Sequence, residues 1–190
     1  MTFITIGCLG FLVIHLFDVV SLKKVPAFKP LVWLAGTGMV VYAVIMLMME
    51  PAKLSLPLWL TVIGWVMVVA SLGLLVYSLF IDLPFKKTYL ASGVGDELVK
   101  TGMYSLVRHP GVIWFSQLMI ALVLVSQSSQ LLLAVPIFIV LDVVLVVIQD
   151  KVFFDRMFDG YQAYRQETPM ILPNRKSLYA FINSIKHLDI

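Results

Sequence analysis

The stretch that decides the fold is RHPGVIWFSQLMIALVLVSQSSQLLLAVPIFIVLDVVLVVIQD, residues 108–150. It contains two apolar runs, 111–125 and 131–148, joined by the uncharged polar turn SQSSQ at 126–130. A helix needs about 20 apolar residues to cross a bilayer, so the second run is close to that length and the first is short. The stretch therefore predicts a helical hairpin in a membrane, with its turn at or just inside one interface.

The composition of the whole chain places this hairpin in an integral membrane protein. Of the 190 residues, 61% are hydrophobic and 13% are charged, whereas a soluble domain is about half apolar and a quarter charged. Three further apolar runs precede the hairpin, at 3–20, 31–49 and 57–81. We therefore expect an all-α, multi-pass membrane protein with about five transmembrane helices, a C-terminal helical hairpin and an amphipathic surface helix.

The chain is expected to form a single membrane domain, residues 1–190, because its loops are too short to hold a second one. Residues 1–81 hold three N-terminal spans, 82–173 the hairpin region, and 174–190 an amphipathic tail. Apolar residues in the tail recur at intervals of three or four, as in helices that lie on a membrane surface. They are Leu178, Phe181, Ile182, Ile185 and Leu188.

The distribution of basic residues predicts the orientation. With five crossings, thirteen of the fourteen Lys and Arg residues fall at one end of the bundle, in segments 21–30, 82–110 and 149–190. Only Lys53 falls at the other end. Because cytoplasmic loops carry the excess of basic residues, we expect the N-terminus outside and the C-terminus in the cytoplasm. Any chemistry is expected at the inner end, where the two feet of the hairpin emerge.

Several residues at these feet are candidates for chemistry. Pro110 suits the first turn of a helix, and Arg108 and His109 then lie at a helix N-terminus, which attracts anionic groups. Asp150 lies at the other foot, so the hairpin can bring it to face Arg108 and His109. From the residues alone the alternative is structural: Arg108 anchors at the headgroups, His109 caps the helix, and Asp150 is a solvated interfacial carboxylate.

Two further carboxylates lie in the apolar runs. Asp142 is two turns deeper than Asp150, and an ionisable residue at that depth is costly and a functional candidate. We expect it to face the protein interior and to be hydrogen-bonded. Asp18, near the end of the first run, is expected to be solvated.

Metal and nucleic-acid sites are not expected. The three histidines and the single cysteine, Cys8, do not have metal-ligand spacing. The formal charge of +3 is too small to indicate nucleic acid binding. We therefore expect no metal site, no intrachain disulfide and no nucleic-acid partner.

The segment FDGYQAYRQETPMILP, residues 158–173, follows the second foot. Gly160 and Pro169 interrupt regular helix, while Tyr161 and Tyr164 are three residues apart and share a helix face. We expect this segment to fold back as a cover over the hairpin feet.

These motifs, in this order, resemble the isoprenylcysteine carboxyl methyltransferase and phospholipid methyltransferase family of membrane enzymes. The resemblance covers about residues 95–173. It rests on the lead-in LVKTGMY at 98–104, the hairpin start RHP at 108–110, the second foot DK at 150–151 and the tail at 158–173.

The resemblance implies a methyltransferase that depends on S-adenosyl-L-methionine and acts at the inner membrane face. Its acceptor would be a lipophilic small molecule or a lipidated molecule, with membrane lipids as surroundings and no metal. The implied cofactor-binding residues are Glu97, Leu98 and Val99, which line the cofactor; Tyr104, His109 and Pro110, which contact it; Arg108, which with the helix mouth takes its carboxylate; and Asp150, which takes its ammonium. No catalytic residue is assigned.

Two alternatives stay open. The chain departs from the family pattern at Val112, Trp114, Val146 and Lys151, which favours a membrane binding or scaffold protein that kept the fold and lost catalysis. The other alternative is an NADPH-dependent membrane reductase, because membrane sterol reductases share a similar Arg-His-Pro hairpin. Against it, no additional basic cluster suits a dinucleotide phosphate. Cofactor binding by the purified protein separates the methyltransferase from the scaffold protein, and the choice of cofactor separates the methyltransferase from the reductase.

Overall fold

The structure, a computed structural model, describes residues 1–23, 25, 28–83 and 98–186. Within these ranges the chain is helical and has no β-strand, so the all-α prediction is confirmed. The long helices are α1 (Thr2–Leu22), α2 (Phe28–Met49), α3 (Leu58–Val76), α5 (Pro110–Ser126) and α6 (Ser129–Ile148). The shorter elements are the π-helical turn η1 (Tyr77–Ile81), α4 (Met103–Leu106), the π-helical turn η3 (Gln149–Phe153), α7 (Phe154–Met157), α8 (Tyr161–Glu167) and α9 (Arg175–Lys186).

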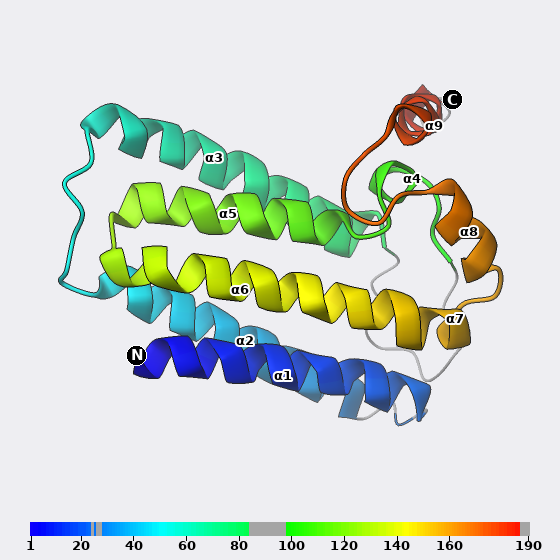
Figure 1. Ribbon diagram of the computed structural model, residues 1–190, viewed down its shortest axis with the longest axis horizontal. Helices are drawn as coiled ribbons and strands as arrows, with labels where there is room; N and C mark the ends of the chain where they lie inside the picture. The colour runs from blue at the N-terminus through cyan, green and yellow to red at the C-terminus, as the bar shows by residue number, and fades with distance from the viewer. Residues whose placement is uncertain (24, 26–27, 84–97, 187–190) are drawn as a thin grey trace.

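The long helices have the length and composition of membrane spans. Four stretches in the described residues are long and apolar enough to cross a bilayer: Thr2–Leu22, Phe28–Met49, Leu58–Ile81 and Ser129–Met157. The shorter apolar helix α5 has 17 residues and is therefore about 25 Å long. Figure 1 shows α5 running beside α3 and α6 along the bundle. The multi-pass fold and the α5–α6 hairpin are as predicted.

The helices form two pairs joined by α6. The first helix packs along α2, and α3 packs along α5, while α6 contacts α1, α2 and α5. Figure 1 shows α6 between the α3–α5 pair and the α1–α2 pair. Because each spanning helix satisfies its own backbone hydrogen bonds, the bundle needs only side-chain packing between the pairs.

The two ends of the bundle differ in polarity. One end, on the left in Figure 1, holds the N-terminus, the α2–α3 connection and the hairpin turn. There Leu54 N donates to the carbonyl oxygen of Gln127 at 2.6 Å, and Ser129 N donates to that of Ala52 at 3.1 Å. The short elements α4, α7, α8 and α9 gather at the opposite end (Figure 1). The polar segments that follow the hairpin feet are therefore together at one end.

The amphipathic helix predicted for the tail is present as α9, which packs on α4 at this polar end. The backbone N–H of Gly102 donates to Ser184 Oγ at 2.8 Å and ties the two segments together. Leu178, Tyr179 and Ile182 are exposed on α9. Contact of this apolar surface with the membrane stays a prediction.

Glycines allow α1 to approach its neighbours closely. A Cβ placed on Gly36 of α2 would lie 2.9 Å from the backbone nitrogen of Ile14 and 3.0 Å from the carbonyl oxygen of Gly10. A Cβ on Gly7 would lie 2.3 Å from the ring of Phe138 on α6. Inside a membrane, helix association depends on such close packing because the lipid is as apolar as the helices. These glycines therefore fix how α1 sits against α2 and α6.

We predict that Gly36→Ala lowers the free energy of unfolding by about 1–3 kcal/mol, the usual range for overpacking. The added Cβ meets backbone atoms of α1, which cannot rotate away. Gly38→Ala is the matched control, because nothing lies within 4 Å of a Cβ at Gly38, and it should be neutral or stabilise by up to about 1 kcal/mol. Thermal unfolding of both variants in one detergent measures the difference. Equal melting temperatures would contradict the role of this contact.

Candidate functional site

A buried ion pair joins the two feet of the hairpin. Arg108 precedes α5, and Asp150 lies in η3 at the end of α6. The Arg108 Nε donates to Asp150 Oδ1 at 2.8 Å, and Nη2 donates to Oδ2 at 3.0 Å. Arg108 is 8% exposed and Asp150 is 2% exposed. Two parallel bonds between charged groups fix both distance and orientation. The prediction that Asp150 faces the Arg108 foot is confirmed.

The segment after α7 satisfies the remaining polar atoms of this pair. The Arg108 Nη1 donates to the carbonyl oxygen of Arg165 at 3.0 Å and also to that of Thr168. The hydroxyl of Tyr161 donates to Asp150 Oδ1. A buried ion pair is stable only when such additional bonds complete it. The segment therefore folds back over the feet, as predicted.

Backbone and tyrosine contacts hold this cover in place. The N–H groups of Arg108 and His109 donate to the carbonyl oxygens of Pro169 and Met170, at 2.9 and 3.0 Å. The buried Tyr164 donates its hydroxyl to the carbonyl oxygen of Tyr104 at 2.6 Å. The rings of Tyr161 and Tyr164 meet edge to face, with centroids 5.9 Å apart, so the two tyrosines share the predicted face.

The charges of the two feet neutralise one another. The resemblance implied that Arg108 takes one end of a zwitterionic cofactor and Asp150 the other, but in the structure each is the other's partner. The alternative of a solvated interfacial carboxylate is wrong for Asp150, because the cover excludes water from it. Contact of either side chain with a cofactor stays a prediction.

His109 differs from its neighbours in having a ring nitrogen without a partner. Nε2 is buried and, among the described residues, makes no hydrogen bond, although Asp150 Oδ1 is 3.5 Å away. The ring stacks on Phe154, with centroids 5.6 Å apart and planes 18° from parallel. Burial lowers the pKa of His109 below its usual value, despite the nearby carboxylate. His109 therefore presents a neutral, fixed imidazole with hydrogen-bonding capacity to spare.

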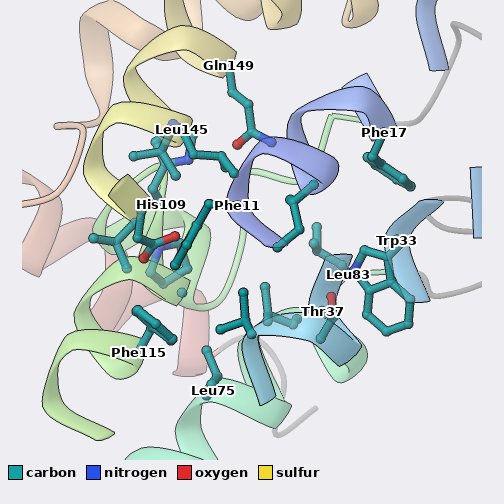
Figure 2. Close-up of a pocket in the computed structure, with 18 of the residues that line it drawn as sticks. Phe11, Phe17, Trp33, Thr37, Leu75, Leu83, His109, Phe115, Leu145 and Gln149 are labelled. Atoms are coloured by element: carbon teal, nitrogen blue, oxygen red, sulfur yellow. The ribbon is translucent and has the colours of Figure 1, made fainter. Parts of the chain in front are cut away.

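A cavity of about 650 Å³ extends from these feet into the bundle. Its wall is mostly apolar and combines all five long helices with the turn after α6. Figure 2 shows Phe11, Trp33, Leu75 and Phe115 around this space, with His109 also in its wall. A volume of this size is typical of small-molecule and cofactor sites.

Most of the predicted cofactor-binding residues line this cavity. Those on its wall are Leu98, Val99, Tyr104, Arg108, His109 and Pro110. Asp150 does not line the cavity, but it contacts Arg108 and His109, and both of these residues line it. Glu97 lies outside the described residues. The structure thus brings the lead-in and the hairpin start to one cavity; cofactor binding by these residues stays a prediction.

A second polar group on the wall was missed from the sequence. Asp18 of α1 is 1% exposed, and both its oxygens accept from Gln149 Nε2 at 3.1 Å. The prediction of a solvated Asp18 is wrong because η3 places Gln149 against the end of α1. The available signal was that Asp18 and Gln149 are polar residues at the same end of apolar runs.

Asp142 lines the cavity from α6, so its predicted interior position is confirmed. The predicted hydrogen bond is not formed with any described residue, and Oδ2 is buried without a partner. One turn further along α6, Leu145 and Val146 also line the cavity. The prediction fails because the side chains next to Asp142 on this helix face are apolar.

The departures from the family pattern fall in two places. Val112 and Val146 are buried and line the cavity. Trp114 and Lys151 do not, and Lys151 is exposed. Of the four, only Val112 and Val146 therefore shape the cavity, and both contribute apolar wall.

Metal ligation has no support in the described part of the chain. No group of three or more His, Cys, Asp or Glu residues in it could hold a metal ion.

A comparison with protein families gives one match. A family model described as phospholipid methyltransferase matches residues 59–159, more than half of the chain. The match runs from α3 through the hairpin and both feet to just beyond α7. No curated protein and no solved structure matches the chain.

We predict that Asp150→Asn lowers the free energy of unfolding by about 3–5 kcal/mol, the usual cost of breaking a buried ion pair. The substitution leaves the buried Arg108 guanidinium without a counter-charge and removes a charged acceptor from Tyr161. Asp155→Asn is the control, because Asp155 is exposed on the next helix and should change stability by less than about 0.5 kcal/mol. Chemical denaturation in one detergent measures both. An Asp150→Asn variant as stable as wild type would show that the pair does not hold the feet together.

Proposed function

Because the chain belongs to the phospholipid methyltransferase family and has the helices of an integral membrane protein, we propose that it transfers a methyl group from S-adenosylmethionine to a lipophilic acceptor at the cytoplasmic membrane face. The observation that carries this proposal is the cavity. Its polar wall at the hairpin feet continues into an apolar interior between the spans. One site with these two parts suits a polar methyl donor and an apolar acceptor together.

The polar end of the cavity fits S-adenosylmethionine. The unpartnered Nε2 of His109 needs a polar ligand atom, and burial of an unsatisfied polar atom is otherwise unfavourable. Tyr104, Phe154 and Phe158 add aromatic wall beside it, which suits both an adenine ring and a positively charged sulfur. When bound, S-adenosylmethionine supplies a methyl group activated by that charge.

The side chains of this site then hold the two reactants in position and exclude water from them. The Arg108–Asp150 pair fixes the two feet, and the stack on Phe154 fixes the His109 ring. Leu98 and Val99 contribute to the wall of the same end. Alignment of two reactants in a dry site supplies a large part of the rate enhancement in such transfers.

The acceptor can reach the cavity from the bilayer. Val41 and Ile45 of α2 and Leu72 of α3 line the cavity and are about half exposed. Since α2 packs along α1 and α3 packs along α5, the entrance proposed for the acceptor is the space between α2 and α3. An opening bordered by apolar side chains admits a hydrocarbon chain more readily than a polar molecule.

One observation favours the scaffold alternative. The Arg108–Asp150 pair is complete without any ligand, as a purely structural link between the feet would be. Cofactor binding by the purified protein separates the two readings, and the choice of cofactor separates the methyltransferase from the reductase.

We predict that the purified protein binds S-adenosylmethionine and that His109→Phe weakens binding about tenfold. Phe keeps the stack on Phe154 but removes a hydrogen bond worth up to about 1.5 kcal/mol. His15→Phe is the matched control, because His15 does not line the cavity. Isothermal titration in one detergent, with NADPH as the second ligand, measures each affinity. No binding of S-adenosylmethionine by wild type would overturn the methyltransferase, and binding of NADPH alone would support the reductase.

We further predict that the end of the bundle carrying Lys53 faces outward, because the sequence assigns thirteen of the fourteen basic residues to segments expected at the other end. Lys53 in the α2–α3 connection and Arg175 at the start of α9 are exposed, and Figure 1 shows that connection and α9 at opposite ends of the bundle. Both residues are suitable sites for a cysteine once Cys8 is replaced by Ser. An impermeant maleimide added to intact cells should label Lys53→Cys and spare Arg175→Cys. The reverse labelling would show the opposite orientation.

A further inference from the structure

The cavity wall contains a carboxylate that the fold does not use. Asp142 lines the cavity from α6, and neither of its oxygens accepts a hydrogen bond from a described residue. Asp18 lines the same cavity, but both its oxygens accept from Gln149. Asp142 therefore has acceptor capacity that only the contents of the cavity can use.

The depth of Asp142 in the span makes a carboxylate without a hydrogen-bond partner energetically unfavourable. It lies well inside the span Ser129–Met157, where a carboxylate costs on the order of 2.5–3.5 kcal/mol. The fold does not offset this cost with an internal partner. An ionisable side chain kept in the membrane without a structural partner is a candidate for binding or chemistry.

The depth of Asp142 separates it from the polar mouth. It precedes Asp150 by eight residues along α6 and η3, which corresponds to about 12 Å at 1.5 Å per residue. Phe115 and Met119 of α5 and Phe11 of α1 line the same cavity. A ligand that reaches Asp142 is therefore in apolar surroundings, beyond the His109 foot.

We propose that Asp142 holds the reacting group of the methyl acceptor and takes its proton. This inference rests on the proposed methyltransferase function and names the kind of acceptor. The reacting atom X, an amine nitrogen or a hydroxyl oxygen, donates its X–H to the Asp142 carboxylate. As the C–X bond forms, the C–S bond of the methyl donor breaks and its electron pair stays on sulfur, which becomes a neutral thioether. The proton of X–H passes to Asp142, so charge and atoms balance.

The acceptor class follows from this arrangement. The reacting atom must carry a hydrogen and must have a lone pair when it attacks, so a protonated amine first passes one proton to the Asp142 carboxylate and then attacks as the neutral amine. A carboxylate acceptor is disfavoured, because Asp142 and Asp18 both line the cavity and like charges repel in apolar surroundings. The acceptor is thus an amine or alcohol on a hydrocarbon chain.

A binding experiment tests this without a methyl donor. Thermal unfolding is measured in one detergent with equal concentrations of dodecylamine or dodecanol. Wild type should be stabilised more by the amine, whereas Asp142→Asn should respond equally to both. Asp18→Asn is the matched control and should keep the amine preference, since Gln149 already occupies that carboxylate. An amine preference retained by Asp142→Asn, or lost only in Asp18→Asn, overturns the assignment.

Turnover gives a second readout. With radiolabelled S-adenosylmethionine and dodecylamine, Asp142→Asn should lower kcat by about a hundredfold, the lower range for loss of a general base. Its affinity for S-adenosylmethionine should stay within about twofold of wild type. Its melting temperature should equal or exceed that of wild type, because an unpartnered buried charge is removed.

The two hypotheses fail in different ways. Absence of methyl transfer by wild type with any acceptor would refute the proposed function, while the amine comparison would still decide whether Asp142 binds the cationic group. Wild-type turnover with an unchanged kcat in Asp142→Asn would refute the role of Asp142 and leave the proposed function intact.

Discussion

The ion pair between Arg108 and Asp150 is the interaction on which the polar end of the protein depends. It closes the open end of the hairpin, opposite the covalent turn, and it anchors the cover through Tyr161 and the carbonyl oxygens of Arg165 and Thr168. A buried pair of this kind gives little net stability compared with apolar packing, but it strongly disfavours every arrangement that leaves one charge alone. The ion pair thus selects one relative position of the start of α5 and the end of α6. Because His109 follows Arg108, this also fixes the position of His109.

The cavity exists because the bundle is made of two helix pairs instead of a closed ring. Within the described residues, α6 makes most of the contacts between the α1–α2 pair and the α3–α5 pair, and α2 also touches α5, while the cavity occupies the remaining interior between the pairs. Near the polar end, the rings of Trp33 and Phe80 meet edge to face with centroids 5.9 Å apart. This contact joins α2 to η1 beside the cavity, whose wall includes Trp33. The pairing of the helices thus accounts for the cavity.

The sequence predicted what depends on local pattern and chain connectivity. Apolar runs give the spans, and a five-residue polar turn forces the feet of the hairpin together, which is why Asp150 was expected near Arg108. The sequence did not predict which polar atoms form hydrogen bonds with one another. Either Arg108 or a ligand can satisfy the Asp150 carboxylate, and the order of residues does not distinguish these two partners. Burial of Asp18 depends on the π-helical turn that directs Gln149 toward α1. A π-helical turn changes the rotation per residue. Helix faces assigned from the sequence assume the α-helical period, so they cannot show where Gln149 points.

Three carboxylates at or beside this cavity, within the described residues, show how surroundings assign roles to one residue type. Asp150 faces a guanidinium, Asp18 faces an amide, and Asp142 faces neither. The first is committed to holding the feet, and the second is committed to the contact between α1 and η3. A ligand that competed for either would have to break an existing bond and leave a buried donor unsatisfied. A ligand at Asp142 breaks nothing, so its hydrogen bond adds to affinity in full. For the same reason, proton transfer to Asp142 disturbs no structural contact, and the protein can accept a proton in its interior without loosening the fold.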